Sequence, residues 1–176
     1  MNGASQRPGP ADPVVDALLR ASRALVSITA RSLSSVNADV TLPQFRTLVM
    51  LATRGPQTVS ALADHLAVHA STMTRMCNRL VTRDLVVRAP SAVDRREVLI
   101  TLSPSGAMLV DQVMQTRRNE LDAIVEGMSP DERAAFVTAL RRFATAAGDD
   151  STRAVDPDDV ATRVHSIGPS TYDFGA

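Results

Sequence analysis

The sequence lacks lysine and tryptophan, and it has few aromatic residues of any kind. Aromatic side chains make up 3% of its 176 residues, with one tyrosine and four phenylalanines. A surface that stacks against single-stranded nucleic acid needs exposed rings, so this composition argues against such a platform. All 19 basic residues are arginines, which a GC-rich coding sequence explains without any functional meaning.

Cysteine and long apolar runs are also scarce. Cys77 is the single cysteine, so no disulfide can form within the chain. No apolar run is long enough to cross a membrane, and the polar, proline-rich residues 1–12 lack the apolar segment of a signal peptide. These features predict a cytoplasmic protein. The sequence shows no spaced nucleophile and partner, no phosphate-binding glycine loop and no metal-ligand cluster, so we expect neither an enzyme nor a bound cofactor or metal.

The formal net charge is zero, but the charges are unevenly distributed. Residues 44–101 contain eight arginines and four acids, whereas residues 102–176 contain seven arginines and twelve acids. A basic middle segment beside an acidic end is typical of proteins that bind nucleic acids, although this pattern is weak on its own.

The spacing of apolar residues predicts a mainly α fold with a small β-hairpin, in the order α-α-α-α-β-β-α-α. We expect a flexible leader at residues 1–12, one domain at 13–147 and an acidic, mostly disordered tail at 148–176. The predicted helices cover about residues 13–35, 43–53, 58–66, 70–83, 104–127 and 130–147, and the predicted strands cover 85–88 and 97–101.

A short helix, a turn and a second helix make a helix-turn-helix, and the hairpin that follows makes a winged version over about residues 42–102. The second of these helices has an apolar face for the core and a polar face that suits the major groove. Arginine there can bind guanine, asparagine can bind adenine, and hydroxyl groups can bind bases or phosphates. The predicted DNA-contacting residues of this helix are Ser71, Thr72, Thr74, Arg75, Asn78 and Arg79.

The tip of the hairpin carries an acid beside two arginines, Asp94, Arg95 and Arg96. Asp94 can hold a guanidinium rigid while that group enters the narrow, electronegative minor groove. A solvated helix face and a charged loop would be the plainer interpretation of either feature alone. Both features fall where a winged helix touches DNA, which favours the DNA-binding hypothesis.

Residues 41–106 resemble the MarR family of bacterial transcription regulators. The matching segments are TLPQFRTLVMLATRGPQTVSALADHL and STMTRMCNRLVTRDLVVRAPSAVDRREVLITLSPSG, of which the Asp-Arg-Arg stretch and the final Leu-Ser-x-x-Gly are the most recognisable. The resemblance implies a homodimer whose helices at about 13–35 and 104–147 interlock, and whose two winged lobes read a palindromic operator in double-stranded DNA. It also implies a repressor released by a small effector, often an amphipathic aromatic acid.

Two residues depart from the family pattern. Asp84 stands where relatives usually have glycine, and His69 stands where a small capping residue is usual. Aspartate tolerates a left-handed backbone better than most residues, so we expect the turn at Asp84 to form. His69 offers no small capping side chain for the second helix, whose start is predicted at Ala70.

Alternative functions stay open at this point. An antirepressor or another protein–protein interaction module on the same fold would have a degenerate recognition face, whereas this chain keeps Arg75 and Asn78. Cys77 could sense redox state, but it falls on the apolar face, where cysteine acts as a small hydrophobic residue. His65 and His69 have a metal-ligand spacing, but a turn is predicted between them.

The sequence does not identify the residues that bind an effector. The remaining arginines considered are Arg23, Arg46 and Arg54 as conceivable partners of a carboxylate, and the pairs Arg117–Arg118 and Arg141–Arg142 as solvated or dimer-facing helix charges.

Overall fold

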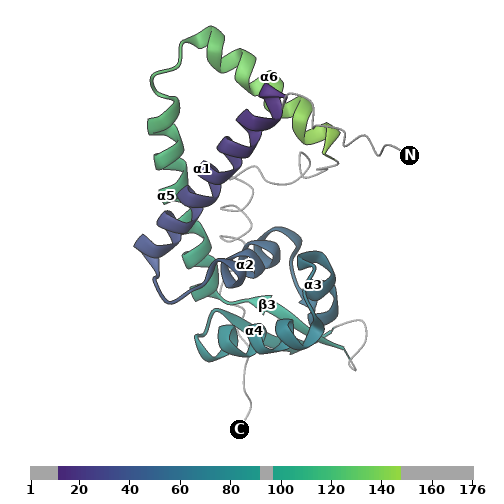
Figure 1. Cartoon of the computed structure of the whole chain (residues 1–176). Coiled ribbons are helices and arrows are strands. Elements are labelled where there is room, and N and C mark those ends of the chain that lie inside the picture. Colours follow the sequence, from purple (N-terminus) through teal and green to yellow (C-terminus); the bar gives the residue numbers. More distant parts are fainter. Residues whose placement is uncertain (1–11, 92–96, 148–176) are drawn as a thin grey trace, which may run out of the picture.

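The computed structural model describes residues 12–91 and 97–147. Within them α2, α3, α4 and the sheet form a lobe, and the long helices α1, α5 and α6 extend away from it (Figure 1). The predicted mainly helical fold is confirmed. The elements are α1 (Pro13–Val36), α2 (Leu42–Arg54), β1 (Gln57–Thr58), α3 (Val59–Leu66), α4 (Ala70–Thr82), β2 (Val86–Pro90), β3 (Val98–Leu102), α5 (Pro104–Val125) and α6 (Pro130–Ala146).

The sheet has three antiparallel strands in the order β1-β3-β2, so the prediction of a two-stranded hairpin was incomplete. In the additional strand β1, Gln57 pairs with Ile100 and Thr58 pairs with Leu99 of β3. Thr58 is also the N-cap of α3, because its side chain accepts a hydrogen bond from the backbone N–H of Ala61 at 3.1 Å. The third strand therefore ties the start of the helix-turn-helix to the hairpin.

The strand β2 begins one residue later than predicted because the backbone N–H of Leu85 takes part in the C-terminal cap of α4. The Leu85 N–H donates to the Leu80 carbonyl at 3.0 Å, and the Asp84 N–H donates to the Val81 carbonyl at 2.9 Å. These two bonds form a Schellman motif, which requires a left-handed residue. Asp84 supplies it with a φ of 55°, so the expectation that aspartate would make this turn is confirmed.

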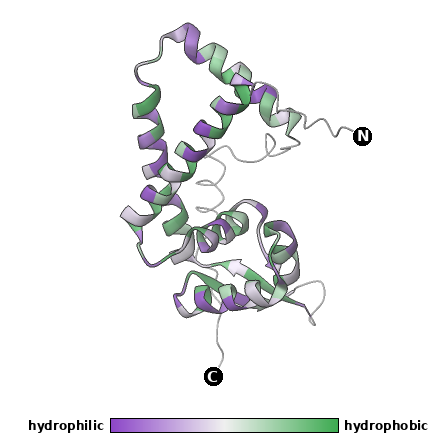
Figure 2. Ribbon diagram, viewed as in Figure 1, coloured by the Kyte–Doolittle hydropathy of each residue, from purple (hydrophilic) through white to green (hydrophobic). Residues whose placement is uncertain are grey.

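The core of the lobe is mainly aliphatic, and its residues come from the helices α2, α3, α4 and α5 and from the sheet. Hydrophobic residues also recur along α1 and α6, beyond that core (Figure 2). No helix in the two described ranges is long and apolar enough to cross a membrane. The largest side chains with almost no exposed surface are Leu48 of α2, Leu62 of α3, Met73 and Leu80 of α4, Ile100 of β3, Val86 of β2, and Val110 and Val113 of α5.

Helices α1 and α5 are joined by a carboxylate with two donors. Glu120 of α5 accepts from Arg31 Nη2 at 3.0 Å and from Ser32 Oγ at 2.9 Å. Ser32 is fully buried, and its single hydroxyl proton lies between the Ile28 carbonyl, also at 2.9 Å, and Glu120. This contact therefore joins the last turns of α1 to the second half of α5.

The first turn of α5 lies against the end of α4. Ser103, the N-cap of α5, accepts from the Gly106 N–H at 3.0 Å and donates its own N–H to the Leu85 carbonyl at 3.2 Å. An ideal Cβ on Gly106 would lie 2.0 Å from that same carbonyl oxygen. Only glycine therefore fits at position 106 without moving the backbone.

The end of α3 contains a strained residue, because Ala67 has a φ of 52°. The left-handed backbone costs an alanine roughly 1–2 kcal/mol, whereas glycine adopts it freely. We expect Ala67→Gly to raise the free energy of unfolding by about 0.5–1 kcal/mol in urea titrations at fixed protein concentration. The matched variant Ala61→Gly, inside the same helix, is expected to lower it by about 1 kcal/mol. Equal losses from both variants would contradict the strain.

Candidate nucleic-acid interface

The helix α4 begins at Ala70, as the sequence predicts, although its N-cap is unusual. His69 makes no side-chain hydrogen bond to the helix. Its backbone carbonyl accepts instead from the N–H groups of Thr72 and Met73, at 2.9 and 3.0 Å. The first turn is therefore closed by the main chain, and the departure at His69 does not move the start of the helix.

One face of α4 is buried in the lobe through Met73, Cys77 and Leu80. Burial raises the pKa of the Cys77 thiol, although the positive charge of Arg88 opposes this effect. A buried thiol with a raised pKa has little thiolate, which is the form that reacts with oxidants. The surroundings of Cys77 therefore favour a structural role over redox sensing.

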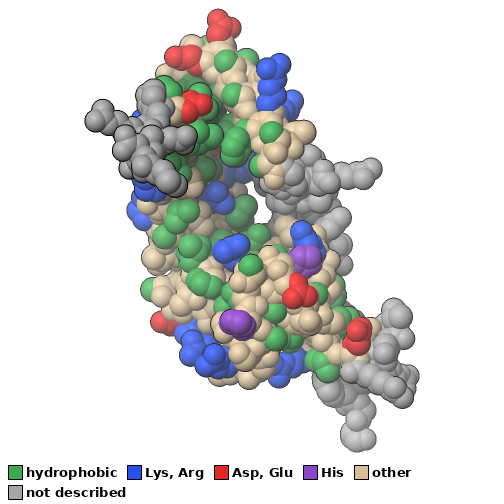
Figure 3. Space-filling view, turned by 45° about the vertical axis from the view of Figure 1, so that its right-hand side comes forward, with side chains coloured by type: hydrophobic (Ala, Val, Ile, Leu, Met, Phe, Trp, Pro, Cys, Tyr) green, Lys and Arg blue, Asp and Glu red, His purple; other side chains and the backbone are tan. Residues whose placement is uncertain are grey.

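The opposite face of α4 carries the six residues that the sequence predicts for DNA contact. Five of them are exposed and Thr72 is half-buried. The Thr74 hydroxyl donates to the Ala70 carbonyl at 2.9 Å, so it can offer DNA only its lone pairs and its methyl group. Arginine side chains are visible on the lower lobe in the space-filling view (Figure 3).

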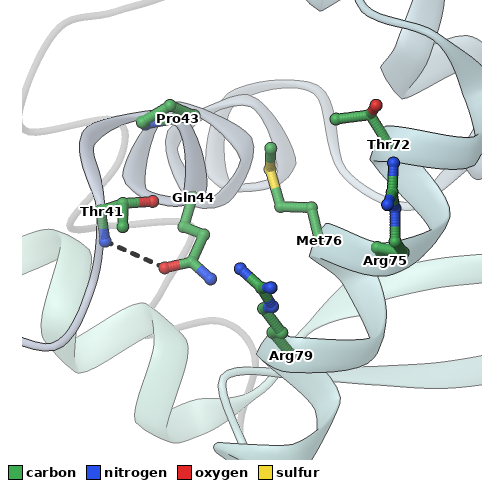
Figure 4. A pocket seen from close by; sticks show the side chains of 7 residues that line it. All are labelled: Thr41, Pro43, Gln44, Thr72, Arg75, Met76 and Arg79. Carbon is green, nitrogen blue, oxygen red and sulfur yellow. Dashed lines mark hydrogen bonds between the residues drawn. The ribbon is translucent and has the colours of Figure 1, made fainter.

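Toward α2, this face borders a pocket of about 230 Å³. Arg75 and Arg79 line it from α4, and Gln44 lines it from α2 (Figure 4). Gln44 Oε1 accepts from the Thr41 N–H at 2.9 Å, and the amide of Gln44 lies next to the guanidinium of Arg79 (Figure 4). Gln44 was not among the predicted site residues, although the capping pattern from Thr41 to Gln44 marks its position.

Toward β2, the same face carries a contact between a helix and a strand. Arg88 Nη2 of β2 donates to Asn78 Oδ1 of α4. Both side chains are exposed, so the pair lies on the surface that α4 would present to a ligand. The sequence analysis also missed Arg88, because no local pattern pairs a strand residue with a helix residue ten positions earlier.

The wing residues Asp94, Arg95 and Arg96 lie outside the described residues. The structure describes the hairpin up to Ser91 on one side and from Glu97 on the other. The Ser91 N–H donates to the Glu97 carbonyl at 2.9 Å. The strands β2 and β3 are paired from Val86 opposite Leu102 to Pro90 opposite Val98. This register sets where the hairpin leaves the lobe.

The two histidines with metal-ligand spacing do not share a helix. His65 lies in α3 within 3.0 Å of Arg54 Nη1, whereas His69 precedes α4. No group of three potential ligands among histidine, cysteine, aspartate and glutamate occurs within residues 12–91 and 97–147. A histidine contacted by a guanidinium is a poor metal ligand, because the metal would compete with a positive charge.

The long helices carry an open apolar groove of about 500 Å³ between α1, α5 and α6. Arg117 lines it, and its Nε is buried with no hydrogen-bond partner among residues 12–91 and 97–147. Arg118, Arg141 and Arg142 are exposed on the outside of their helices. Neither this groove nor the pocket beside α4 is lined by Arg23, Arg46 or Arg54. The other groove residues are Val15, Leu18, Leu19, Ala21, Ser22, Leu25, Val26, Thr29, Leu140 and Phe143.

Comparison with known proteins places this surface in a family. Residues 40–98 match the model of the MarR family. The chain is 33% identical over 105 residues to the HTH-type transcriptional repressor NicR of Pseudomonas putida, covering 60% of this chain and 66% of NicR. It is 30% identical over 106 residues to the multiple antibiotic resistance protein MarR of Salmonella typhimurium, covering 60% of this chain and 74% of that protein.

A solved structure agrees with these relatives over most of the domain. The crystal structure of RV1404 from Mycobacterium tuberculosis matches with a TM-score of 0.72 and 46% sequence identity. The match covers 77% of this chain and 92% of that one. The chain therefore belongs to the MarR family of winged-helix, DNA-binding transcription regulators.

Proposed function

We propose that the chain is a dimeric repressor of transcription that binds a specific palindromic operator. The observation that carries the proposal is the exposed face of α4. It presents Arg75, Asn78 and Arg79 on a helix whose other face is locked into the core. A rigid helix with these side chains matches the width of the major groove and the hydrogen-bonding groups of its bases.

The dimer is supported by apolar surface that one copy leaves uncovered. The 17-residue helix α6 contains no buried residue, yet Phe136, Val137, Leu140 and Phe143 are each about half exposed. An exposed apolar surface of this size on long helices marks an interface. A second copy related by a two-fold axis would cover it and would present two recognition helices to two half-sites.

The wing extends the proposed contact to the minor groove. Asp94, Arg95 and Arg96 are proposed to lie at the flanks of the operator, with Asp94 bracing a guanidinium. The motivation is the register of β2 and β3, which carries the hairpin away from the lobe beside α4. Arginine in a narrow minor groove reads groove width and potential more than base sequence.

Two further parts of the proposal come from relatives: that the chain represses transcription, and that a small ligand releases it from DNA. NicR is described as a repressor, and the resemblance to the MarR family implies release by a small ligand. We assign this role to an amphipathic or aromatic effector. The pocket beside α4 combines apolar lining with the guanidinium groups of Arg75 and Arg79, which suits such a molecule.

The proposal is tested by Arg75→Ala. If Arg75 binds guanine through two hydrogen bonds, its loss is expected to weaken binding by about 1–3 kcal/mol and to relax preference at one base pair of each half-site. The measurement is a titration of the full chain with an operator selected from random duplexes and with its single-base variants. Arg118→Ala on α5 removes the same charge and is expected to change neither quantity. An equal loss on all duplexes would make Arg75 a phosphate contact.

A further inference from the structure

The pocket beside α4 contains a buried side chain with an unused hydrogen-bond donor. Gln44, which lines the pocket, is only 4% exposed. Its Oε1 accepts from the Thr41 N–H at 2.9 Å, and because a backbone N–H can only donate, this bond fixes which end of the amide is the oxygen. Within residues 12–91 and 97–147, Gln44 Nε2 donates to no acceptor. A buried donor is costly to leave unpaired, so we expect an acceptor from outside these residues to bind it.

The pocket places this donor beside positive charge. The amide of Gln44 lies next to the guanidinium of Arg79, and Arg75 lines the same pocket (Figure 4). Neither guanidinium forms an ion pair with an acid of the described residues. Pro43 and Gln44 belong to the first turn of α2, where the helix dipole also favours an anion. The surroundings of Gln44 Nε2 therefore suit an anion with oxygen acceptors.

We propose that this pocket binds one phosphate of the operator backbone through Gln44 Nε2 and the guanidinium of Arg79, an inference that rests on the proposed function. Gln44 is buried in its own lobe, so its side chain cannot extend to a base edge in the major groove. Phosphates line both sides of that groove and approach the protein beside a recognition helix. Arginine and glutamine are both common ligands of DNA phosphates.

The inference gives the two arginines of the pocket different roles. The guanidinium of Arg79 lies next to Gln44, whereas that of Arg75 lies farther from it (Figure 4). A phosphate contact fixes the register of the protein on DNA and carries no sequence information, so Arg79 anchors the lobe while Arg75 reads a base. The carboxylate of the proposed effector would use the same donors, so the phosphate and the effector cannot occupy the pocket together.

The variant Gln44→Glu changes the donor and keeps the helix cap. Glutamate also serves in a capping box, so one of its oxygens still accepts from the Thr41 N–H, while the other replaces the NH₂ group by a negative charge. Operator affinity of the full chain is expected to fall by about tenfold or more, and by the same factor on single-base variants of the operator. Gln112→Glu, at an exposed position of α5, makes the same chemical change and is expected to keep wild-type affinity.

The second measurement replaces the phosphates of the selected operator, one at a time, by uncharged methylphosphonates. At the phosphate bound in the pocket, replacement is expected to weaken wild type by about tenfold or more. The same replacement is expected to strengthen binding of Gln44→Glu, because it removes the repulsion between two negative charges. Arg79→Met is expected to lose sensitivity at this phosphate and to lower the salt dependence by about one ion per protomer.

The outcomes distinguish this inference from the function on which it rests. A wild type that selects no operator would overturn the DNA-binding proposal and this inference together. Two results would overturn the inference alone. One is a Gln44→Glu protein with wild-type affinity. The other is a methylphosphonate profile that is parallel in wild type and Gln44→Glu at every phosphate, which would leave Gln44 with the helix cap and the pocket with small ligands only.

Discussion

Replacing Gly106 with alanine is expected to lower the free energy of unfolding by about 3 kcal/mol or more. The added Cβ would lie 2.0 Å from the Leu85 carbonyl oxygen and 3.0 Å from Leu102 Cδ1. The carbonyl cannot move away cheaply, because it accepts from the Ser103 N–H and follows the left-handed Asp84. The first turn of α5 would therefore have to shift away from the lobe.

Urea unfolding of the full chain at fixed concentration measures this effect. Gly127→Ala is the matched control, because a Cβ there meets no atom within 4 Å. It is expected to change the free energy of unfolding by less than about 0.5 kcal/mol. If the two variants unfold at the same denaturant concentration, the close approach of α5 to Leu85 is wrong.

The second large effect concerns the apolar groove of the long helices. Leu140→Asp is expected to make the chain monomeric, because it places a charge at the centre of the surface that a second copy would cover. The loss of one linked half-site is expected to weaken operator binding by about 10²–10⁴-fold, which is the usual benefit of joining two binding units. Light scattering and operator titration measure the two quantities.

A control variant on the same helix distinguishes loss of the dimer interface from loss of folded structure. Thr138→Asp introduces the same charge at an exposed position outside the groove and is expected to leave both quantities unchanged. Circular dichroism is expected to show helix in both variants, because α6 buries no side chain within its own chain. A dimeric Leu140→Asp protein with unchanged operator affinity would refute the proposed interface.

The features that the sequence predicted well are those with a local physical cause. The helix α4 was predicted from the spacing of Met73, Cys77 and Leu80, and that spacing also separates the buried face from the polar face. The starts of α5 and α6 follow from Ser103 and Ser129, whose side chains accept from the helix N–H groups three residues later.

The features that the sequence analysis missed depend on partners distant in the chain. A two-residue strand such as β1 has no periodicity, and only its pairing with β3 makes it a strand. The Arg88–Asn78 bond likewise depends on how β2 lies beside α4. The left-handed Ala67 is a different case, because local bonds that close the end of α3, such as that from the Val68 N–H to the Ala63 carbonyl, oppose the preference of alanine.

The pairing of β1 with β3 has a consequence for how regulation can operate. The strand β3 pairs both with β1, which precedes α3, and with β2, which follows α4. The helix-turn-helix is therefore held at both ends by one sheet, which restricts motion within the lobe. A bound effector would then leave the shape of each lobe unaltered and act on the separation of two lobes. In a dimer, two recognition helices fit B-DNA when they lie about 34 Å apart, one helical turn. A small rotation of one copy against the other would change that spacing.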